Sequence, residues 1–370
     1  MKGNYTDSVV KDLCEKFLIK GKYLGFEIMP YGHINKTLRV FFDRDGEKRS
    51  YVLQRINTYV FKKPKGIMAN IVEVTEFIRG KMRGKGIDTT RRCLKYQKTE
   101  EGSPYFVDDE GGFWRAYRYI DDSEAINLTD DLFIIKQSGK AFGEFQNYLS
   151  DYDAEKLFIS IPHFHNTVNR YRIFKEAVSN NFADRKSSVE AEIKEFLALE
   201  DVATQMYTMQ QSGELKLRVT HNDTKSNNVL FDTKTHEHLA VIDLDTVMPG
   251  LVGFDFGYAI RFAASSALED EPDTSKVHLD LDKFEAFTKG FVGELKHSLS
   301  KNEIETLALG AVTMTVEVGV RFLTDYLDGD KYVGIHYPEP NLVRARCQLA
   351  LAKDMLKKLD KMGEIVKKYV

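Results

Sequence analysis

The spacing of hydrophobic residues changes several times within the first 120 positions. Val9, Val10, Leu13, Phe17 and Leu18 follow one another at intervals typical of one apolar helix face, so the chain is expected to begin with a short helix. Apolar and polar residues then alternate with a period of about two, which is typical of strands that bury one face. The change of period indicates that a sheet follows the first helix.

Five segments in this part carry the aromatic and β-branched residues of strands, and one helix interrupts them. Pro64 suits the first turn of a helix, and Ile67, Ile71, Val74 and Ile78 keep a helical spacing. The predicted strands occupy residues 25–28, 37–42, 51–56, 92–97 and 112–120. We therefore expect a five-stranded antiparallel sheet with one helix inserted after the third strand.

From Ser123 onward the pattern is mainly helical. Amphipathic stretches occupy residues 130–149, 166–183, 187–211, 282–299 and 301–327, and one β-rich island interrupts them at 217–243. These patterns predict an α+β fold of two lobes with a cleft between them. We expect an N-terminal antiparallel sheet lobe over residues 1–120 and a mainly helical C-terminal lobe over residues 121–370.

The β-rich island brings three oxygen-bearing side chains together. A short apolar strand leads towards Asp223, Asn228 opens a second strand, and a third strand runs back to Asp243. In an antiparallel hairpin the entry of one strand lies beside the exit of the other, which puts Asn228 next to Asp243 and Asp223 at the mouth of the hairpin. Mg²⁺ is bound by few carboxylates together with substrate phosphates. We therefore expect Asn228 and Asp243 to be metal ligands.

The same stretch has the spacing His-x-Asp-x-x-x-x-Asn of a kinase catalytic loop, from His221 to Asn228. In such a loop the aspartate, here Asp223, accepts the proton of the acceptor hydroxyl. Lys225 would direct a positive charge at the transferred phosphate, and Asn228 would act on the metal. We expect His221 to order the loop through hydrogen bonds. The pattern predicts transfer of the terminal phosphate of a nucleoside triphosphate to a small molecule.

Two neighbouring motifs offer other interpretations. The run Asp-Phe-Gly at 255–257 matches a kinase motif, but it is not at the end of the strand that pairs with Asn228. We expect Asp255 to cap or anchor a helix over residues 257–262. Asp243 and Asp245 also fit the DxDxT signature of haloacid-dehalogenase-like phosphatases, as nucleophile and general acid. That signature usually opens a parallel sheet, whereas a sheet lobe and a kinase-type loop precede it here.

Backbone groups of the first lobe are candidates for nucleotide contacts. Gly32 lies in a loop between two predicted strands and is a candidate phosphate-binding residue. The segment from Tyr117 to Asp121 crosses from the sheet to the helical lobe. Tyr119 and Ile120 in this segment would offer backbone groups to the edge of an adenine ring.

The third predicted strand is expected to provide a cation for the phosphates, paired with a carboxylate on the following helix. No lysine occupies this strand, so Arg55 or Gln54 would take the role. Glu73 or Glu76 on the next helix is the possible partner. The phase of the strand alone does not choose between positions 54 and 55.

Two further groups of polar residues have simple interpretations. Glu317, Arg321 and Asp325 are spaced by four and share one helix face, which is typical of surface ion pairs. His163 and His165 alternate like residues of a strand. A metal site would need further ligands that the sequence does not place beside them, so packing or a substrate contact is expected for these histidines.

The composition narrows the class of partner. Lys+Arg 53 and Asp+Glu 56 nearly cancel, so the chain lacks the one-sided basic charge of a nucleic-acid-binding protein. Its three cysteines form no CxxC pair, and no apolar run has the length of a signal peptide or a membrane span. We expect a cytoplasmic enzyme with a small-molecule substrate and no nucleic-acid or membrane partner. The oligomeric state is not predicted.

Several motifs together resemble a known family. The segments 221–232 and 241–250 are similar to the aminoglycoside phosphotransferase and choline kinase superfamily, which has a protein-kinase-like fold. Segments over the whole chain look more closely like the N-acetylhexosamine 1-kinases. The matching segments are Gly32 to Asn35, Tyr51 to Asn57, Thr220 to Lys225, Val241 to Gly250 and Gly319 to Leu327.

The resemblance implies an ATP- and Mg²⁺-dependent kinase that phosphorylates GlcNAc or GalNAc at the anomeric hydroxyl to give the sugar 1-phosphate. By residue, it implies that Asp223 is the base and a sugar anchor and that Asp243 is the magnesium ligand. His33, Arg321 and Tyr332 fall where that family contacts the sugar. For Arg321 the resemblance therefore favours a sugar contact over a surface ion pair.

Three other functions remain open from the sequence. The nearest is a phosphotransferase that acts on another hydroxyl compound, such as an aminoglycoside, choline or a different sugar. The others are the phosphatase described above and a non-catalytic relative that only binds nucleotide or sugar. The complete set of Asp223, Asn228 and Asp243 speaks against the non-catalytic relative.

Overall fold

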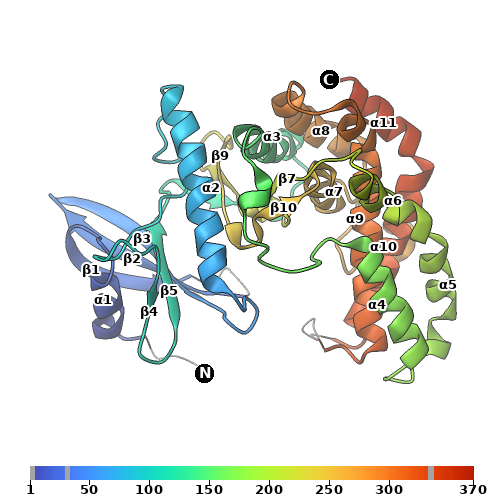
Figure 1. The fold of residues 1–370 in the computed structure, drawn as a ribbon, viewed down its shortest axis with the longest axis horizontal. Coiled ribbons are helices and arrows are strands. Elements are labelled where there is room, and N and C mark those ends of the chain that lie inside the picture. The colour runs from blue at the N-terminus through green and yellow to red at the C-terminus, as the bar shows by residue number, and fades with distance from the viewer. Residues whose placement is uncertain (1–4, 30–33, 332–336) are drawn as a thin grey trace.

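The computed structural model of the chain describes residues 5–29, 34–331 and 337–370 and has two lobes (Figure 1). In the first lobe a five-stranded antiparallel sheet has the order β1-β2-β3-β5-β4. The short helix α1 (Asp7–Glu15) packs its apolar residues on one face of this sheet. The strands are β1 (Lys22–Ile28), β2 (Lys36–Arg44), β3 (Glu47–Ile56), β4 (Phe106–Val107) and β5 (Phe113–Arg118).

The number of strands is as predicted, but the fourth strand is not residues 92–97. That segment begins in a turn and joins β5 through a single bridge between Tyr96 and Tyr117. Cys93 and Leu94 are both buried, so the alternation of a strand is broken there. The fourth strand is the two-residue β4, which pairs with β5 at Phe113 and Trp114.

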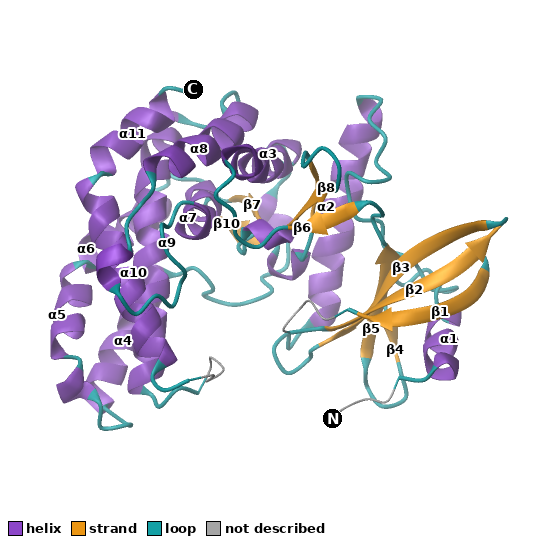
Figure 2. Cartoon of the chain, turned by 180° about the vertical axis from the view of Figure 1, so that it is seen from behind, coloured by secondary structure: helices purple, strands orange, loops and turns teal. Residues whose placement is uncertain are grey.

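The second lobe is mainly helical, as predicted (Figure 2). One predicted helix, 187–211, is two helices that meet at Leu199. The helices are α3 (Leu132–Tyr148), α4 (Thr167–Asn180), α5 (Glu190–Ala198), α6 (Glu200–Gln211), α7 (Val252–Ala263), α8 (Leu281–Leu295), α9 (Lys301–Leu327), α10 (Pro340–Lys357) and α11 (Leu359–Lys367). Short 3-10 helices are η1 (Ala154–Lys156), η2 (Lys186–Ser188), η3 (Ser226–Asn228), η4 (Leu244–Thr246) and η5 (Thr274–Lys276).

Helix α9 forms the centre of this lobe and packs against α4, α6, α7, α10 and α11. Among the helices of the described residues it alone is long and apolar enough to cross a membrane. Of its most apolar stretch, 89% is buried inside the protein. The apolar composition of α9 is therefore used in the core.

Helix α2 (Pro64–Gly84) stands between the sheet and the helical lobe (Figure 1). Its apolar residues share one core cluster with residues of both lobes, including Phe113 from the sheet and Val247 from the helical lobe. The Asn70 side chain donates hydrogen bonds to the carbonyls of Phe158 and Val247, at 2.7 and 2.9 Å. The two lobes are thus packed through α2, and the domain boundary at residue 120 stays a prediction.

Candidate active site

The β-rich island folds as the predicted hairpin. Strands β8 (Val229–Asp232) and β9 (His238–Val241) are antiparallel, and β6 (Ser123–Ala125) pairs with β8. Just before β8, the carbonyl of Asn228 accepts a hydrogen bond from the backbone N–H of Ile242 at 2.9 Å. Asn228 and Asp243 are therefore neighbours across the hairpin, as the sequence predicts.

The catalytic-loop candidates lie together at the mouth of this hairpin. The Asn228 amide donates to the backbone carbonyl of Asp223 at 2.8 Å and to its carboxylate at 3.2 Å. The Lys225 ammonium is 3.3 Å from the other carboxylate oxygen of Asp223. Both side chains of this ion pair are partly exposed, so they remain accessible to a substrate. Asp223, Lys225 and Asn228 form one constellation.

His221 and Asn222 give the loop its shape. His221 is fully buried, and its Nε2 lies 2.9 Å from the Ile242 carbonyl while its Nδ1 accepts from the Asp223 N–H at 3.2 Å. The expectation that His221 orders the loop is met by this geometry. Asn222 has the left-handed φ of 65°, which asparagine tolerates better than most residues. Its side-chain amide donates to the Thr246 carbonyl at 3.0 Å.

Asp255 anchors this loop, and the prediction that it serves its own helix is wrong. It lies in the first turn of α7, which spans Val252–Ala263 and not only residues 257–262. Its carboxylate accepts the backbone N–H groups of His221 and Asn222 at 2.8 and 2.7 Å. The Gln146 side chain adds a third hydrogen bond at 2.6 Å. A buried carboxylate thus holds two peptide groups beside Asp223.

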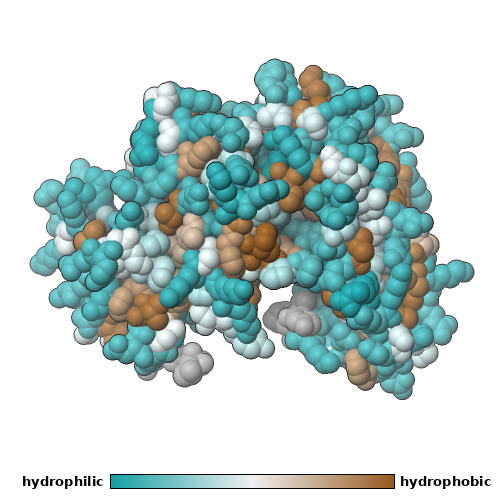
Figure 3. Space-filling view, in the orientation of Figure 1, coloured by the Kyte–Doolittle hydropathy of each residue, from teal (hydrophilic) through white to brown (hydrophobic). Residues whose placement is uncertain are grey.

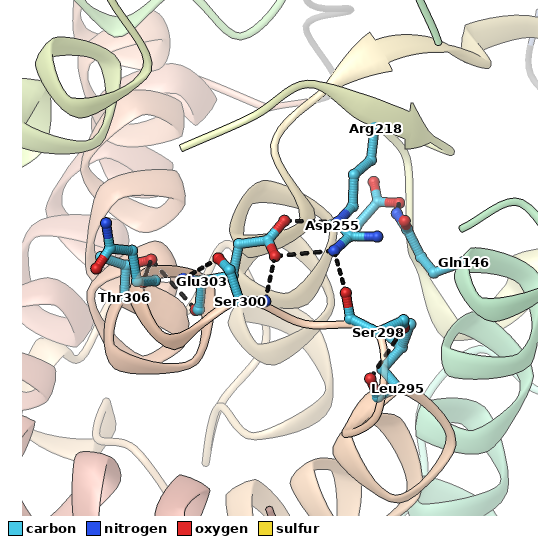
Figure 4. A network of polar contacts seen from close by, with 9 residues as sticks. Gln146, Arg218, Asp255, Leu295, Ser298, Ser300, Glu303 and Thr306 are labelled. Carbon is cyan, nitrogen blue, oxygen red and sulfur yellow. Dashed lines mark hydrogen bonds and ion pairs between the residues drawn. The ribbon is translucent and has the colours of Figure 1, made fainter. Parts of the chain in front are cut away.

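The strand that enters the loop is also fixed by a buried ion pair (Figure 4). Arg218 begins β7 (Arg218–Thr220), which pairs with β10 (Met248–Gly250). Its guanidinium donates to both carboxylate oxygens of Glu303, at 2.5 and 2.8 Å, and to the Ser298 carbonyl. Glu303 also completes the capping box of α9 with Ser300. The core helix and the catalytic loop are therefore linked at this point.

Asp243 has the environment expected of a cation ligand. Part of its side chain is open to solvent, but the carboxylate lies in a depression where protein atoms surround it on most sides. This burial, together with the carboxylates of Asp245 and Asp223, raises the pKa of Asp243 to about 6. Among the described residues its carboxylate has no hydrogen-bond or ion-pair partner. A divalent cation would stabilise the charged form of such a group.

The oxygen-bearing side chains that meet at this point are the carboxylates of Asp223 and Asp243 and the amide of Asn228. Within the described part of the chain there is no group of three or more His, Cys, Asp or Glu side chains that could hold a metal. A metal that relies on few protein oxygens and on substrate phosphates, as Mg²⁺ does, fits these residues. A metal that needs a complete protein cage, such as structural zinc, does not fit them.

The sequence interpretation missed the buried cation of the first lobe, which is Arg115 on β5. Its guanidinium forms a bidentate ion pair with Asp245, and both side chains are at most 3% exposed. Gln54 accepts from Arg115 Nε at 2.8 Å, and Asn35 donates to Asp245 at 2.8 Å. Gln54 and Arg115 are paired across β3 and β5. An arginine on the strand expected beside the third strand was therefore the signal in the sequence that pointed to this cation.

The structure does not bring Arg55 to this point. Arg55 lies opposite Trp114, on the face of the sheet that packs on α1, and its guanidinium is 5.9 Å from the Trp114 ring. Successive side chains of a strand point to opposite faces, so Gln54 is the residue that faces the second lobe. The helix carboxylates lie near other groups, since Glu73 acts electrostatically on the Tyr152 hydroxyl and Glu76 lies close to arginines of its own helix.

The segment that crosses between the lobes contains Tyr119 and Ile120. The Tyr119 N–H donates to the Ser50 carbonyl at 3.1 Å, and the Arg39 guanidinium stacks 3.9 Å from its ring. Ile120 is buried in the core cluster that joins the lobes, and its carbonyl accepts from the Ser123 hydroxyl. Their contact with an adenine ring stays a prediction.

Helix α9 carries Arg321 into the neighbourhood of Tyr258, where Asp223 also acts. Glu317 and Asp325 are buried, so the surface ion pairs considered for this helix face are not present. Arg321 is partly buried, lies 5.9 Å over the Phe164 ring, and has no ion pair among the described residues. Arg321, Lys225 and Asp223 all act electrostatically on the Tyr258 hydroxyl. Gly32, His33 and Tyr332 lie outside the described residues.

Comparisons with known proteins agree with this geometry. The model of the phosphotransferase enzyme family matches residues 37–288, which include the hairpin and the catalytic loop. An aminoglycoside phosphotransferase from Alicyclobacillus acidocaldarius is 13% identical with a TM-score of 0.62, covering 100% of this chain and 98% of that one. A choline kinase from Cryptosporidium parvum is 12% identical with a TM-score of 0.56, covering 98% and 99%.

A third similar structure is a spectinomycin phosphotransferase in complex with ADP and spectinomycin. It is 14% identical with a TM-score of 0.54, and the match covers 95% of this chain and all of that chain. At these identities the structural likeness shows the fold, and the family model shows the membership. The resemblance to the aminoglycoside phosphotransferase and choline kinase superfamily is confirmed, and the chain belongs to the phosphotransferase enzyme family.

Proposed function

We propose that this protein transfers the γ-phosphate of ATP to the anomeric hydroxyl of an N-acetylhexosamine, GlcNAc or GalNAc, and forms the sugar 1-phosphate. The constellation of Asp223, Asn228 and Asp243 carries the proposal of phosphoryl transfer, since its members converge from two strands on one point. The family and the spectinomycin phosphotransferase solved with ADP support a nucleotide as the donor. The motif resemblance supports the amino sugar as the acceptor.

The surroundings of Asp223 support its proposed role as the catalytic base. Its carboxylate is partly exposed at the mouth of the hairpin, and the Asn228 amide holds one of its oxygens. It would accept the proton of the attacking hydroxyl and orient the oxygen towards the γ-phosphorus. Lys225, 3.3 Å from Asp223, would neutralise charge on the transferred phosphoryl group. Asn228 and Asp243 would hold Mg²⁺, which supplies charge neutralisation at the phosphates when bound.

The charge around Asp223 favours a neutral acceptor over a cationic one. Three cations and one carboxylate act on the Tyr258 hydroxyl. The cations are Lys225, Arg261 and Arg321, and the carboxylate is that of Asp223. Arg261 is paired with Glu269, but Arg321 has no ion pair among the described residues. Choline and aminoglycosides are cations, which proteins hold with carboxylates or aromatic cages. A neutral sugar carries hydroxyl and carbonyl oxygens that accept hydrogen bonds from arginine.

The phosphatase alternative does not fit the fold. Asp243 follows β9, whose partner β8 is antiparallel, and the sheets of the described residues include no parallel sheet around it. Asp245, the general acid of that mechanism, is paired with Arg115 in a buried site. An ion pair of this kind stabilises the charged carboxylate and not the protonated acid. The membership in the phosphotransferase enzyme family also speaks for transfer rather than hydrolysis.

An acceptor panel tests the proposal. ADP release would be measured with ATP and Mg²⁺ on GlcNAc, GalNAc, glucose, galactose, choline and kanamycin, with Asp223→Asn as the blank. Release with GlcNAc or GalNAc, and a product phosphorylated at C1, is the expected result. Release with choline or kanamycin instead would assign another acceptor to the same chemistry. If none of the acceptors in a broader sugar panel gives ADP release, the result would support a non-catalytic relative.

A further inference from the structure

His165 lies directly beneath the catalytic loop. It precedes α4 by two residues, and its side chain is only 5% exposed. The ring bridges two parts of the lobe, since Nδ1 is 2.8 Å from a carboxylate oxygen of Glu317 and Nε2 is 3.0 Å from the backbone carbonyl of Asn222. Asn222 immediately precedes Asp223. The ring thus joins the core helix α9 to the peptide group that carries the candidate base.

The chemistry of these two partners fixes the protonation of the ring. A backbone carbonyl only accepts hydrogen bonds, and an ionised carboxylate only accepts them. Neutral histidine has one N–H donor and one acceptor nitrogen, so it satisfies only one of the two contacts. Both contacts are made when Nδ1 and Nε2 each carry a proton. The geometry therefore calls for an imidazolium ion.

The carboxylate of Glu317 is the counter-ion of this cation. Glu317 is fully buried on α9, and its second oxygen accepts a hydrogen bond from the Thr167 hydroxyl at 2.7 Å. Burial by itself would raise the pKa of Glu317, but the charge and hydrogen bond of His165 and the charge of Arg170 more than offset it. The net shift is a lowered pKa. Glu317 is therefore ionised at neutral pH.

Other charged and titratable groups surround the pair. Burial raises the pKa of the Tyr258 hydroxyl, so this group of α7 is neutral. Its ring is tilted by 53° to the imidazole, with 5.8 Å between the ring centroids. Arg170 of α4 acts electrostatically on Glu317. Tyr258, which adjoins the imidazole, is in turn acted on by the charges of Asp223, Lys225, Arg261 and Arg321. Glu317 is the only carboxylate among them that bonds to the ring, so the pair is neutral as a unit.

We propose that His165 is a buried imidazolium that serves as a positioning residue for Asp223. Its two hydrogen bonds tie the Asn222 carbonyl to Glu317, which fixes the peptide between Asn222 and Asp223 and so the direction of the Asp223 carboxylate. The link to catalysis rests on the proposed phosphoryl transfer. The protonation state does not, because it follows from the contacts of the ring alone.

NMR of the free protein tests the protonation state without activity. The protein would be labelled with ¹⁵N-histidine, and the His165 signal would be assigned by its loss in His165→Gln. Two protonated ring nitrogens at pH 7 are the expected result, because both partners of the ring only accept hydrogen bonds. A neutral tautomer at pH 7 would overturn the proposal. His297→Gln, which changes an exposed histidine just after α8, is the control.

Kinetics then test the positioning role. In His165→Gln we expect kcat to fall by about 10- to 100-fold, the effect of slight misplacement of a catalytic group, with the KM values of ATP and sugar little changed. His297→Gln should match the wild type. Unchanged kcat in His165→Gln would overturn the positioning role, while a wild type inactive on every acceptor would instead refute the proposed function.

Discussion

At the scale of single residues, two left-handed positions shape the site. Asn222 and Asp243 have φ values of 65° and 58°, which turn the chain on either side of Asp223 and Asn228. Asn and Asp adopt this conformation at lower cost than most residues. Both positions combine a strained turn with an oxygen-bearing side chain, a combination typical of functional sites. Their polar residue types therefore serve the backbone as well as the chemistry.

Asp223→Asn should abolish turnover while the protein still binds nucleotide. The amide cannot accept the proton of the acceptor hydroxyl, so we expect kcat to fall by about 10³-fold or more. ADP release would measure the loss, and calorimetric titration with ADP would measure binding. Asn227→Ala, an exposed neighbour in the same loop, is the control and should keep near-normal activity. Comparable turnover in the two variants would remove Asp223 from the mechanism.

Arg321→Ala should weaken the acceptor and leave the nucleotide alone. If Arg321 donates hydrogen bonds to the sugar, its loss should raise the sugar KM by about 10-fold or more, and the ATP KM should stay within about two-fold. Steady-state kinetics with each substrate varied in turn would show the difference. Arg346→Ala is a suitable control, because Arg346 is exposed and pairs with Glu192 instead. Equal sugar KM values in both variants would return Arg321 to a structural role.

The residues of the site differed in how well the sequence predicted them. Asp223, Asn228 and Asp243 are joined by one short hairpin, so their convergence follows from local pairing alone. Arg115 and Asp245 are 130 positions apart and meet only because the lobes pack together. No local pattern contains that contact, and the phase of β3 left Arg55 and Gln54 equally possible.

At the scale of elements, close helix packing holds the platform of the site. A Cβ atom added to Gly257 of α7 would lie 2.1 Å from the carbonyl oxygen of Gly310 on α9. A Cβ added to Gly310 would lie 2.2 Å from the Gly253 carbonyl. Real Cβ atoms do not approach backbone so closely, so glycine is required where these helices cross. The contact fixes α7, which carries Asp255 under the catalytic loop.

Gly257→Ala should therefore destabilise the protein despite the better helix propensity of alanine. We expect the free energy of unfolding to fall by about 1–3 kcal/mol, the usual cost of overpacking, as measured by urea denaturation. Gly363→Ala in α11 is the matched control, since nothing lies within 4 Å of its added Cβ. That variant should gain up to about 1 kcal/mol. A stabilised Gly257→Ala would show that the helices can separate without cost.

The ion pair between Arg218 and Glu303 should make stability depend on acid pH. The pKa of Glu303 is lowered in the folded state, because Arg218 and Ser300 outweigh the effect of burial. A lowered folded-state pKa means that the stabilisation is fully present above the unfolded-state value of about 4.3 and is lost as the pH falls through the folded-state value. The pair should therefore contribute fully at pH 7 and little under acid conditions.

Glu303→Gln is expected to lower the free energy of unfolding by about 3–5 kcal/mol at pH 7, because it leaves Arg218 buried without a counter-ion. The difference from the wild type should shrink as the pH falls from the unfolded-state value of about 4.3 through the lowered folded-state pKa, where the wild-type carboxyl group becomes protonated too. Glu305→Gln, an exposed position on the same helix that pairs with Lys301, should stay within about 0.5 kcal/mol at every pH. A difference that does not vary with pH would contradict the role of the ion pair.

Element types followed from periodicity more reliably than element edges. The spacing of apolar residues predicted α9 over its full length, because a 27-residue helix repeats its pattern many times. The two-residue β4 carries no periodicity, and its place in the sheet depends on pairing with β5. The segment 92–97 has strand-like composition, but its consecutive residues Cys93 and Leu94 are both buried in the core, which the alternation of a strand does not allow.

At the scale of the whole molecule, the lobes are joined by packing and by charge. Helix α2 contributes to a core cluster that includes residues of both lobes. Beside it, Arg115 of the sheet reaches Asp245, two residues after the candidate metal ligand Asp243. Asn35, from the loop between β1 and β2, bonds to the same carboxylate. The position of Asp243 therefore depends on how the sheet is seated on the helical lobe.

Single and double substitutions of this interlobe ion pair should show how strongly Arg115 and Asp245 are coupled. Arg115→Met leaves the Asp245 carboxylate buried and unpaired, so we expect the free energy of unfolding to fall by about 3–5 kcal/mol. Asp245→Asn alone should cost a similar amount, because it leaves Arg115 unpaired. The double variant should lose clearly less stability than the sum of the two single losses. With both residues replaced, no buried charge is left without a partner.

Urea denaturation of the three variants gives the coupling free energy directly. Arg49→Met is the control, since Arg49 pairs with Glu47 on the exposed part of β3 and its loss should change stability by less than about 1 kcal/mol. Additive losses in the double variant would mean that Arg115 and Asp245 stabilise the lobes independently. A coupled loss, accompanied by a raised Mg²⁺ requirement for ADP release in Arg115→Met, would mean that the seating of the sheet also sets the position of Asp243.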